Sequence, residues 1–237
     1  MSRANLVGRV FGNVCPGCRQ VSSSVCGNCV EQISQIKSSV MSPKFHETAG
    51  TSAFGTTFNK VIVAFGYGKV VRQLILSMKY CNMRSSVAVL GTALAERIIQ
   101  EMAISHQKID LIAWAPTTDR RKFQRGHDHA EILARFVAKE LHVPCRGALR
   151  RLTDQPQTGR TRQQRLIGPR FVSRPINNQC VVVIDDVVTT GTTLRFASQA
   201  LYEGGAELVI CAAVASTVLW QSLIESCEPE TAKRSKP

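Results

Sequence analysis

The sequence predicts an α/β protein in which helices flank a parallel sheet, with a small cysteine module in front of it. Short apolar runs that suit buried strands alternate with segments in which apolar residues recur at helical spacing. Near the amino terminus, two C-x2-C pairs have the spacing of a metal-binding module. The length of 237 residues accommodates one sizeable domain together with such a module.

The first part of the chain divides into the module, a linker and the start of the domain. We place the module at residues 1–31 and the linker, rich in Ser, Thr and Gly, at residues 32–59. The domain, expected over 60–220, begins with a strand within 58–68. Helices are predicted within 70–80 and 86–101, where apolar residues fall on one face.

The second part of the domain repeats the alternation of strands and helices. IDLIAWAP predicts a strand that stops at Pro116, and it is followed by a helix over 127–142. After a short strand near 145–150 and an Arg- and Gln-rich segment, we expect a strand at 180–184, a helix over 193–205 and a strand at 207–214. Such βαβ units imply a parallel sheet with right-handed crossovers. The polar tail, 221–237, is expected to be disordered at its end.

The charge is strongly basic, with 30 Lys and Arg against 17 Asp and Glu, a net charge of +13 and a pI near 9.7. Between Asp119 and Arg174 there are fourteen basic residues against five acidic ones. This excess favours a polyanionic partner, either a nucleic acid or a multiply phosphorylated small molecule. The alternative is an ordinary solvated basic face.

The sequence favours a cytoplasmic protein with no membrane insertion. Its first residues, MSRANLVGRVFG, lack the apolar run of a signal peptide. The most apolar segment, which begins at Leu208, is too short to span a bilayer. Cysteines are reduced in the cytosol, so the nine present here favour a metal site over disulfides.

Four cysteines form the candidate metal site: Cys15, Cys18, Cys26 and Cys29. Paired C-x2-C turns can place four thiolates around a tetrahedral Zn²⁺, and Gly17 and Gly27 permit tight turns. The alternatives are redox-active dithiols or disulfides and an iron–sulfur cluster. No histidine lies nearby, so we expect the zinc to be structural. The remaining cysteines are most simply buried apolar residues: Cys81, Cys145, Cys180, Cys211 and Cys227.

The stretch VVVIDDVVTTGTTL (181–194) carries the candidate ligand site. Asp185 and Asp186 end an apolar strand, and the small-residue loop that follows opens a helix: Thr189, Thr190, Gly191, Thr192 and Thr193. Ligands of open parallel sheets bind beyond the carboxyl ends of the strands. The acids can accept hydrogen bonds from ribose hydroxyls, and the loop can bind a phosphate. These residues therefore describe a ribose 5-phosphate site; the simpler alternative is a capped turn and a helix start.

This stretch resembles the phosphoribosyl pyrophosphate (PRPP) motif of type I phosphoribosyltransferases. The wider pattern is similar to the ComF family, competence-associated proteins that join a zinc ribbon to such a domain. Three further stretches carry the resemblance: residues 67–79, 114–135 (WAPTTDRRKFQRGHDHAEILAR) and 151–166 (RLTDQPQTGRTRQQRL). With the cysteines, the resemblance extends over nearly the whole chain apart from the linker and the tail.

The resemblance implies roles for individual residues. Asp185 and Asp186 would bind the ribose hydroxyls and the threonine loop the 5-phosphate, with Mg²⁺ accompanying PRPP. Residues 116–121 correspond to the pyrophosphate loop and 157–165 to a mobile covering loop. Further PRPP contacts would come from Pro116, Thr117, Thr118 and Arg120, and catalytic charge stabilisation from Arg121, Arg125 and Arg165 alongside the acid pair.

Two nearby positions depart from the family pattern. Where ComF relatives have R-G-F-[ND]-Q-A, this chain has Arg125-Gly126-His127-Asp128-His129-Ala130. His127 and His129 are either acid–base groups or, more simply, exposed histidines at the start of a helix.

Three functions agree with these observations. The first is a phosphoribosyltransferase that transfers phosphoribosyl from PRPP to an unidentified acceptor, with a role in DNA uptake or natural transformation. The second is a non-catalytic competence factor that handles single-stranded DNA through the basic region 120–174, together with competence-machinery proteins. The third is a transcription regulator that senses PRPP, which the absence of a helix-turn-helix pattern disfavours.

Overall fold

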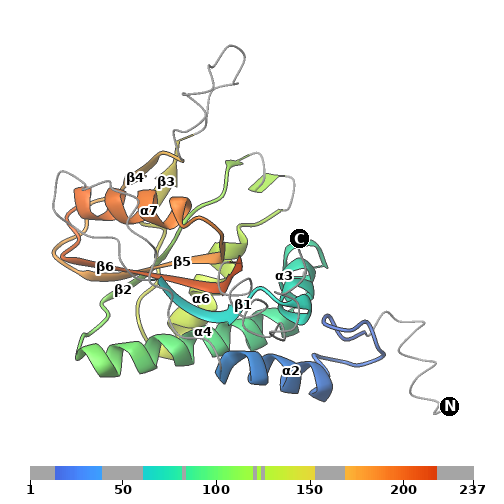
Figure 1. Ribbon diagram of the computed structural model, residues 1–237. Coiled ribbons are helices and arrows are strands. Elements are labelled where there is room, and N and C mark those ends of the chain that lie inside the picture. Colours follow the sequence, from blue (N-terminus) through green and yellow to red (C-terminus); the bar gives the residue numbers. More distant parts are fainter. Residues whose placement is uncertain are drawn as a thin grey trace, which may run out of the picture.

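The computed structural model describes residues 14–38, 61–81, 84–119, 122–123, 126–152 and 169–217 (Figure 1). Its centre is a parallel sheet of four strands in the order β1-β6-β5-β2. These strands are β1 (Val61–Gly66), β6 (Leu208–Ser216), β5 (Cys180–Val188) and β2 (Leu111–Trp114). The predicted parallel sheet with intervening helices is therefore present.

Helices cover both faces of the sheet (Figure 1). On one face, α3 (Lys69–Cys81), α4 (Arg84–Ser105) and α6 (His129–Leu141) pack against strand residues such as Ile62, Ile112 and Val182. On the other face, α7 (Thr192–Glu203) packs against residues one position away, such as Val181. Successive side chains of a strand point to opposite faces, so a strand with helices on both sides must be apolar throughout. This explains the unbroken apolar runs in the sequence.

A two-stranded antiparallel ribbon lies on the α7 side of the sheet. It consists of β3 (Leu149–Arg151) and β4 (Phe171–Ser173). The short strand expected near 145–150 is thus split: Cys145 makes an isolated parallel bridge to Ile112, and β3 begins four residues later. The Arg- and Gln-rich segment between the two ribbon strands, 153–168, lies outside the described residues.

The cysteine module shares the core of the domain. Helix α2 (Gly27–Ser38) begins inside the second C-x2-C pair and continues past residue 31, the boundary we expected for the module. Cys15, Cys29 and Ile33 belong to the same buried cluster as the residues of α3 and α4. The rest of the expected linker, 39–60, and the tail, 221–237, lie outside the described residues. Within the described ranges, no helix combines the length and the apolar character needed to cross a membrane.

Candidate functional site

Asp185 and Asp186 lie inside the second half of β5, because this strand continues to Val188 instead of ending at residue 184. Ile184 is the last β5 residue to pair with β2, opposite Trp114. Beyond it, β6 is the one strand among the described residues that pairs with β5, and Asp185 lies opposite Ala213. The sheet can therefore accommodate two acids here, since the strand on one side has already ended. Both acids are half-buried.

The two carboxylates have unequal surroundings. Burial and the adjacent Asp186 raise the pKa of Asp185 to about 7. The backbone N–H of Asp186, which donates to Asp185 Oδ1 at 2.8 Å, and the charge of Lys79 offset only part of this increase. At neutral pH, the protein without a ligand therefore holds Asp185 partly protonated.

Lys79 is a site residue that sequence reasoning did not include. Its Nζ lies 2.5 Å from Asp186 Oδ2, and both side chains are less than one-fifth exposed. Lys79 reaches the acid pair from α3, so no spacing within one element could place it there. The available signal was its position at the end of the 67–79 stretch that resembles the ComF family.

The threonine loop connects β5 to α7. Gly191 is buried, has a φ of 71° and precedes the first helical residue, Thr192. Only glycine adopts such a backbone readily, and glycine brings no side-chain cap to the helix. Thr190 Oγ1 and Thr192 Oγ1 lie 2.8 Å apart, while Thr189 is exposed. The loop thus presents hydroxyl groups at the N-terminus of α7, where Gly191 supplies no side-chain cap. Such a helix N-terminus favours the binding of an anion.

Asp128 links the loop after β2 to the start of α6. Its Oδ2 accepts a hydrogen bond from the Thr117 N–H at 2.8 Å, and its Oδ1 accepts one from the Ala130 N–H at 3.1 Å. The side chain caps α6 and is only 3% exposed, and this burial raises its pKa above the usual value. Asp128 is the second site residue that we did not predict. It occupies the [ND] position of the ComF pattern, which was the available signal.

The two histidines beside Asp128 are not both exposed, which corrects the simpler expectation for them. His129 is 3% exposed and His127 is half-buried. Their rings meet edge to face with centroids 5.3 Å apart. His129 is the first residue of α6 and lies among the residues that this helix buries.

The predicted ligand residues meet at the carboxyl edge of the sheet as far as the structure describes them. Pro116, Thr117 and Thr118 follow β2 and are half-buried, and the neighbouring strand β5 carries the acid pair. The charge of Asp128 contributes to the raised pKa of Asp185, which shows that these two groups are within electrostatic range. Four predicted cations lie outside the described residues: Arg120, Arg121, Arg125 and Arg165.

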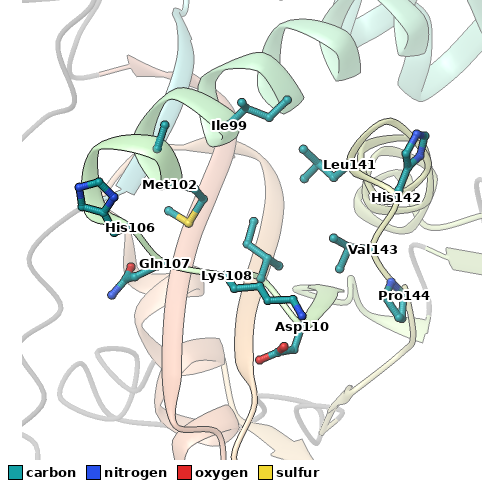
Figure 2. Close-up of a pocket in the computed structure, with 12 residues that line it drawn as sticks. Ile99, Met102, His106, Gln107, Lys108, Asp110, Leu141, His142, Val143 and Pro144 are labelled. Carbon is teal, nitrogen blue, oxygen red and sulfur yellow. The ribbon is translucent and has the colours of Figure 1, made fainter.

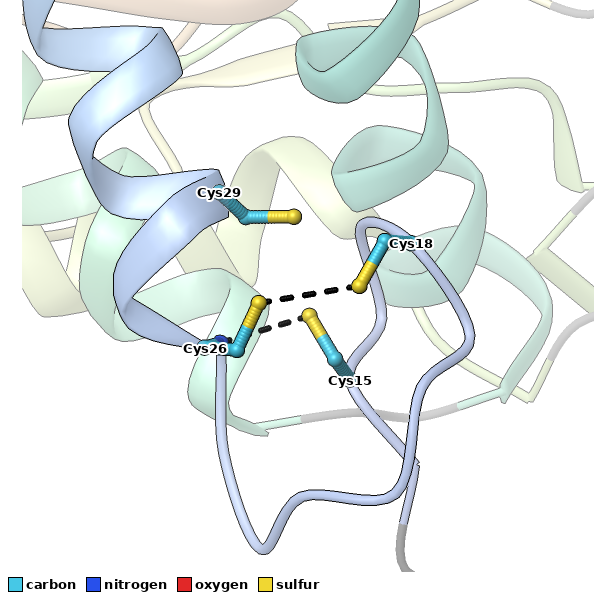
Figure 3. Close-up of side chains that lie close together, drawn as sticks. All are labelled: Cys15, Cys18, Cys26 and Cys29. Atoms are coloured by element: carbon cyan, nitrogen blue, oxygen red, sulfur yellow. Dashed lines mark hydrogen bonds between the residues drawn. The ribbon is translucent and has the colours of Figure 1, made fainter.

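The four cysteines of the module converge on one point (Figure 3). Their Sγ atoms all lie within 4.8 Å of one another, and those of Cys18 and Cys26 are 3.6 Å apart. Four sulfurs bound to a tetrahedral Zn²⁺ at about 2.3 Å would stand about 3.8 Å apart. The eight cysteines that the structure describes are all free thiols. The cluster therefore fits a metal ion held by four thiolates.

The environment of Cys15 favours its thiolate. Burial alone would raise the pKa of Cys15, but backbone N–H groups of the turn lower it to about 6. Two of them, from Gly17 and Cys26, donate to Cys15 Sγ at 3.4 and 3.3 Å. Burial and the neighbouring sulfurs raise the pKa of Cys29.

Of the other cysteines, Cys180 and Cys211 are buried, as expected for apolar residues. Cys145 is half-buried, whereas Cys81 is exposed at the end of α3, so the expectation was wrong for Cys81. Cys227 lies outside the described residues.

A groove of about 720 Å³ lies at the opposite edge of the sheet (Figure 2). It is bordered by the end of α4, the end of α6 and Asp110, which directly precedes β2. This groove is separate from the acid pair, because the acids lie at the carboxyl ends of the strands and Asp110 at an amino end.

Comparison with known proteins identifies the domain. A phosphoribosyl transferase domain family matches residues 128–219, which include the acid pair and the threonine loop. With the parallel sheet and its flanking helices, this match confirms the predicted type I phosphoribosyltransferase-like fold.

Curated relatives extend the similarity beyond that domain. Competence protein ComFC of Bacillus subtilis (strain 168) is 22% identical over 202 residues, which span 83% of this chain and 75% of the relative. DNA utilization protein YhgH of Escherichia coli O6:H1 is 24% identical over 160 residues, 64% of this chain and 70% of the relative. Among solved structures, an adenine phosphoribosyltransferase aligns over 81% of this chain and 94% of its own, with 14% identity and a TM-score of 0.42.

Proposed function

Because this chain is a ComF family protein with a phosphoribosyltransferase domain, we propose that it binds PRPP at the carboxyl edge of its sheet. The observation that carries the proposal is the acid pair of β5 followed directly by the threonine loop at the start of α7. Carboxylates can accept hydrogen bonds from vicinal hydroxyls, and the N–H groups of a helix N-terminus can bind a phosphate. A ribose 5-phosphate presents these two groups side by side.

Each part of PRPP has a complementary group in this arrangement. Asp185 and Asp186 accept hydrogen bonds from the ribose hydroxyls, and residues Thr189–Thr193 hold the 5-phosphate. The backbone at Thr117 and Thr118, anchored by Asp128, would face the pyrophosphate together with Arg120. Mg²⁺ bound with PRPP would neutralise part of the pyrophosphate charge, and the carboxylate oxygens of the acid pair suit this ion.

Transfer of the phosphoribosyl group requires stabilisation of the departing pyrophosphate and exclusion of water. We propose that Arg121, Arg125 and Arg165 supply positive charge and that the segment 157–165 covers the site. Zn²⁺ in the cysteine cluster would have a structural role, since all four of its ligands come from the protein. The name of the Bacillus relative, competence protein ComFC, supports a role in natural transformation. We propose that the protein acts there in the cytoplasm, with competence-machinery proteins as partners.

Calorimetry with PRPP and Mg²⁺ tests the binding site. Replacing Asp185→Asn and Asp186→Asn together should abolish binding, because amide groups cannot replace two carboxylates. A matched control, Glu203→Gln with Glu207→Gln, removes two exposed acids elsewhere and should bind as the wild type does. Equal affinity of the acid-pair variant and the wild type would refute the proposal.

A second function, the handling of single-stranded DNA, is favoured by the basic β3–β4 ribbon. Arg150, Arg170 and Arg174 are exposed on or beside it, and the guanidinium carbon of Arg151 lies 5.6 Å from the Phe171 ring centroid. Such a surface can follow a phosphate backbone, and the relative's name, DNA utilization protein YhgH, agrees with this role.

The salt dependence of oligonucleotide binding tests the second function. The variant Arg150→Ala with Arg170→Ala should lower the slope of log affinity against log salt by about 2. Lys108→Ala with Lys139→Ala, which removes two exposed cations elsewhere, should leave the slope unchanged. Oligonucleotide affinity that does not vary with salt would exclude a backbone-tracking surface.

A further inference from the structure

Helix α3 lies between the cysteine cluster and the acid pair, and it contacts both (Figure 1). On one side, Ser77 Oγ donates a hydrogen bond to the backbone carbonyl of Pro16, inside the first C-x2-C turn, at 3.1 Å. On the other side, Lys79 Nζ pairs with Asp186 Oδ2 at 2.5 Å. Two residues of a helix turn through about 200°, so these side chains leave the helix in nearly opposite directions.

The contact between α3 and the cysteine turn is close. Ser77 is 3% exposed and Pro16 is buried. A β-carbon added at Gly17 would lie 2.7 Å from Cys29 Sγ and 3.2 Å from Val70 Cγ1. The turn is therefore enclosed between the cluster's own sulfur and α3, and a change in its shape must displace one of them.

A metal ion in the cluster would restrain the shape of that turn. Cys15 and Cys18 flank Pro16 and Gly17, so a metal ion bound to both thiolates fixes the carbonyl to which Ser77 donates. Without a metal, the four sulfur groups have no common partner, and metal binding and local folding are coupled in such modules. The position of α3 against the turn would then depend on the occupancy of the cluster.

The contact between α3 and the acid pair also depends on the position of α3. Lys79 is the cation paired with Asp186, and its charge also lowers the pKa of the adjacent Asp185. A shift of α3 that lengthens the Lys79–Asp186 distance leaves two neighbouring carboxylates with less compensation. Their orientation for ribose hydroxyls then changes, since Lys79 no longer holds Asp186.

We propose that Lys79 is a positioning residue of the ribose site and that the metal-loaded cysteine cluster holds it in place through Ser77 and α3. The proposal rests on PRPP binding for its functional consequence, but the structural linkage is independent of the ligand. Loss of metal should therefore weaken PRPP binding even though the cluster contributes no ligand contact.

The variant Ser77→Ala separates the linkage from the metal, because it removes the hydrogen bond to Pro16 and leaves all four cysteines. Ser105→Ala is the control, since Ser105 makes a comparable bond to the Glu101 carbonyl at 2.9 Å near the far end of α4. Each protein is analysed for zinc content and for PRPP affinity with Mg²⁺. We expect Ser77→Ala to keep its zinc and to bind PRPP roughly tenfold more weakly. Ser105→Ala should match the wild type.

A second measurement does not depend on PRPP. In protein labelled with ¹³C-lysine, the Lys79 side-chain signal is assigned with Lys79→Gln. This signal should shift in Ser77→Ala and after chelation of the zinc, and not in Ser105→Ala. If circular dichroism shows that the chelated protein is unfolded, the test of the linkage relies on the zinc-loaded Ser77→Ala protein.

The outcomes separate the two proposals. An unshifted Lys79 signal in Ser77→Ala, together with unchanged PRPP affinity, overturns the linkage. If the Lys79 signal shifts in Ser77→Ala but the wild-type protein binds no PRPP, the linkage is supported and the proposed function is refuted.

Discussion

Acidic side chains lie near both ends of β5, but they affect the stability of the fold in opposite ways. At the amino end, Asp110 accepts a hydrogen bond from the Cys180 N–H at 2.9 Å, joining the start of β2 to the start of β5. At the carboxyl end, Asp185 and Asp186 are adjacent, and burial with mutual repulsion raises the pKa of Asp185 to about 7. Asp110 thus stabilises the protein itself, whereas the acid pair costs stability until a ligand is bound.

The largest expected effect is an increase in stability when the buried carboxyl group of Asp185 is replaced. The raised pKa of Asp185 means that the folded protein binds an extra proton between about pH 4 and pH 7, so stability falls as pH rises through this range. Asp185→Asn should therefore stabilise the ligand-free protein by on the order of 2–4 kcal/mol at pH 8 and by little at pH 4.

Urea denaturation at both pH values measures this effect. A gain that is the same at pH 4 and pH 8 would contradict the assignment to the ionisation of Asp185. Asn accepts the hydrogen bond from the Asp186 N–H through its own oxygen, so this contact is kept in the variant.

A smaller loss is expected when the acid at the amino end is removed. Asp110→Ala leaves the N–H of the buried residue Cys180 without its carboxylate partner, which should cost about 1–3 kcal/mol at pH 7. PRPP affinity should be unchanged, because Asp110 lies at the far edge of the sheet. Thermal unfolding and calorimetry on the same samples check both statements, and weaker PRPP binding would show that the two ends are coupled.

The smallest expected effect on stability comes from Asp128, an acid at the carboxyl edge that accepts two backbone hydrogen bonds. Asn at position 128 keeps one oxygen for either the Thr117 or the Ala130 N–H and turns an amide N–H₂ group toward the other. Asp128→Asn should cost about 1 kcal/mol of stability and displace the loop at Thr117. Denaturant unfolding measures the first effect. Weaker binding of inorganic pyrophosphate, with unchanged binding of ribose 5-phosphate, measures the second.

Local patterns predicted the elements and the two sets of candidate ligands. The spacing of Cys15, Cys18, Cys26 and Cys29 predicted their convergence, because each C-x2-C turn acts over only a few residues. The run from Val181 to Leu194 predicted a strand, an acid pair and a helix start for the same reason. The exact end of β5 was missed, since it depends on β6 as a partner rather than on the residues of β5 alone.

The contacts that complete the site could not be predicted from local patterns. Lys79 and Asp186 are far apart in the sequence and meet only because α3 packs beside the carboxyl edge of the sheet. The same holds for Ser77 and Pro16, and for Asp128 and the Thr117 N–H. His129, expected to be exposed, is buried because α6 turns its first residue toward the interior.

By itself, the sequence determined the alternation of strands and helices, the cysteine cluster and the order of acids and threonines at the ligand site. These features follow from periodicity and spacing, which act between neighbours in the chain. Only the tertiary structure decided which charge faces the acid pair, which acid anchors the loop after β2, and that the cysteine module packs against the helix that carries Lys79. The physical reason is that burial and ion pairing between distant segments depend on how whole elements pack, and that packing is a property of the folded domain.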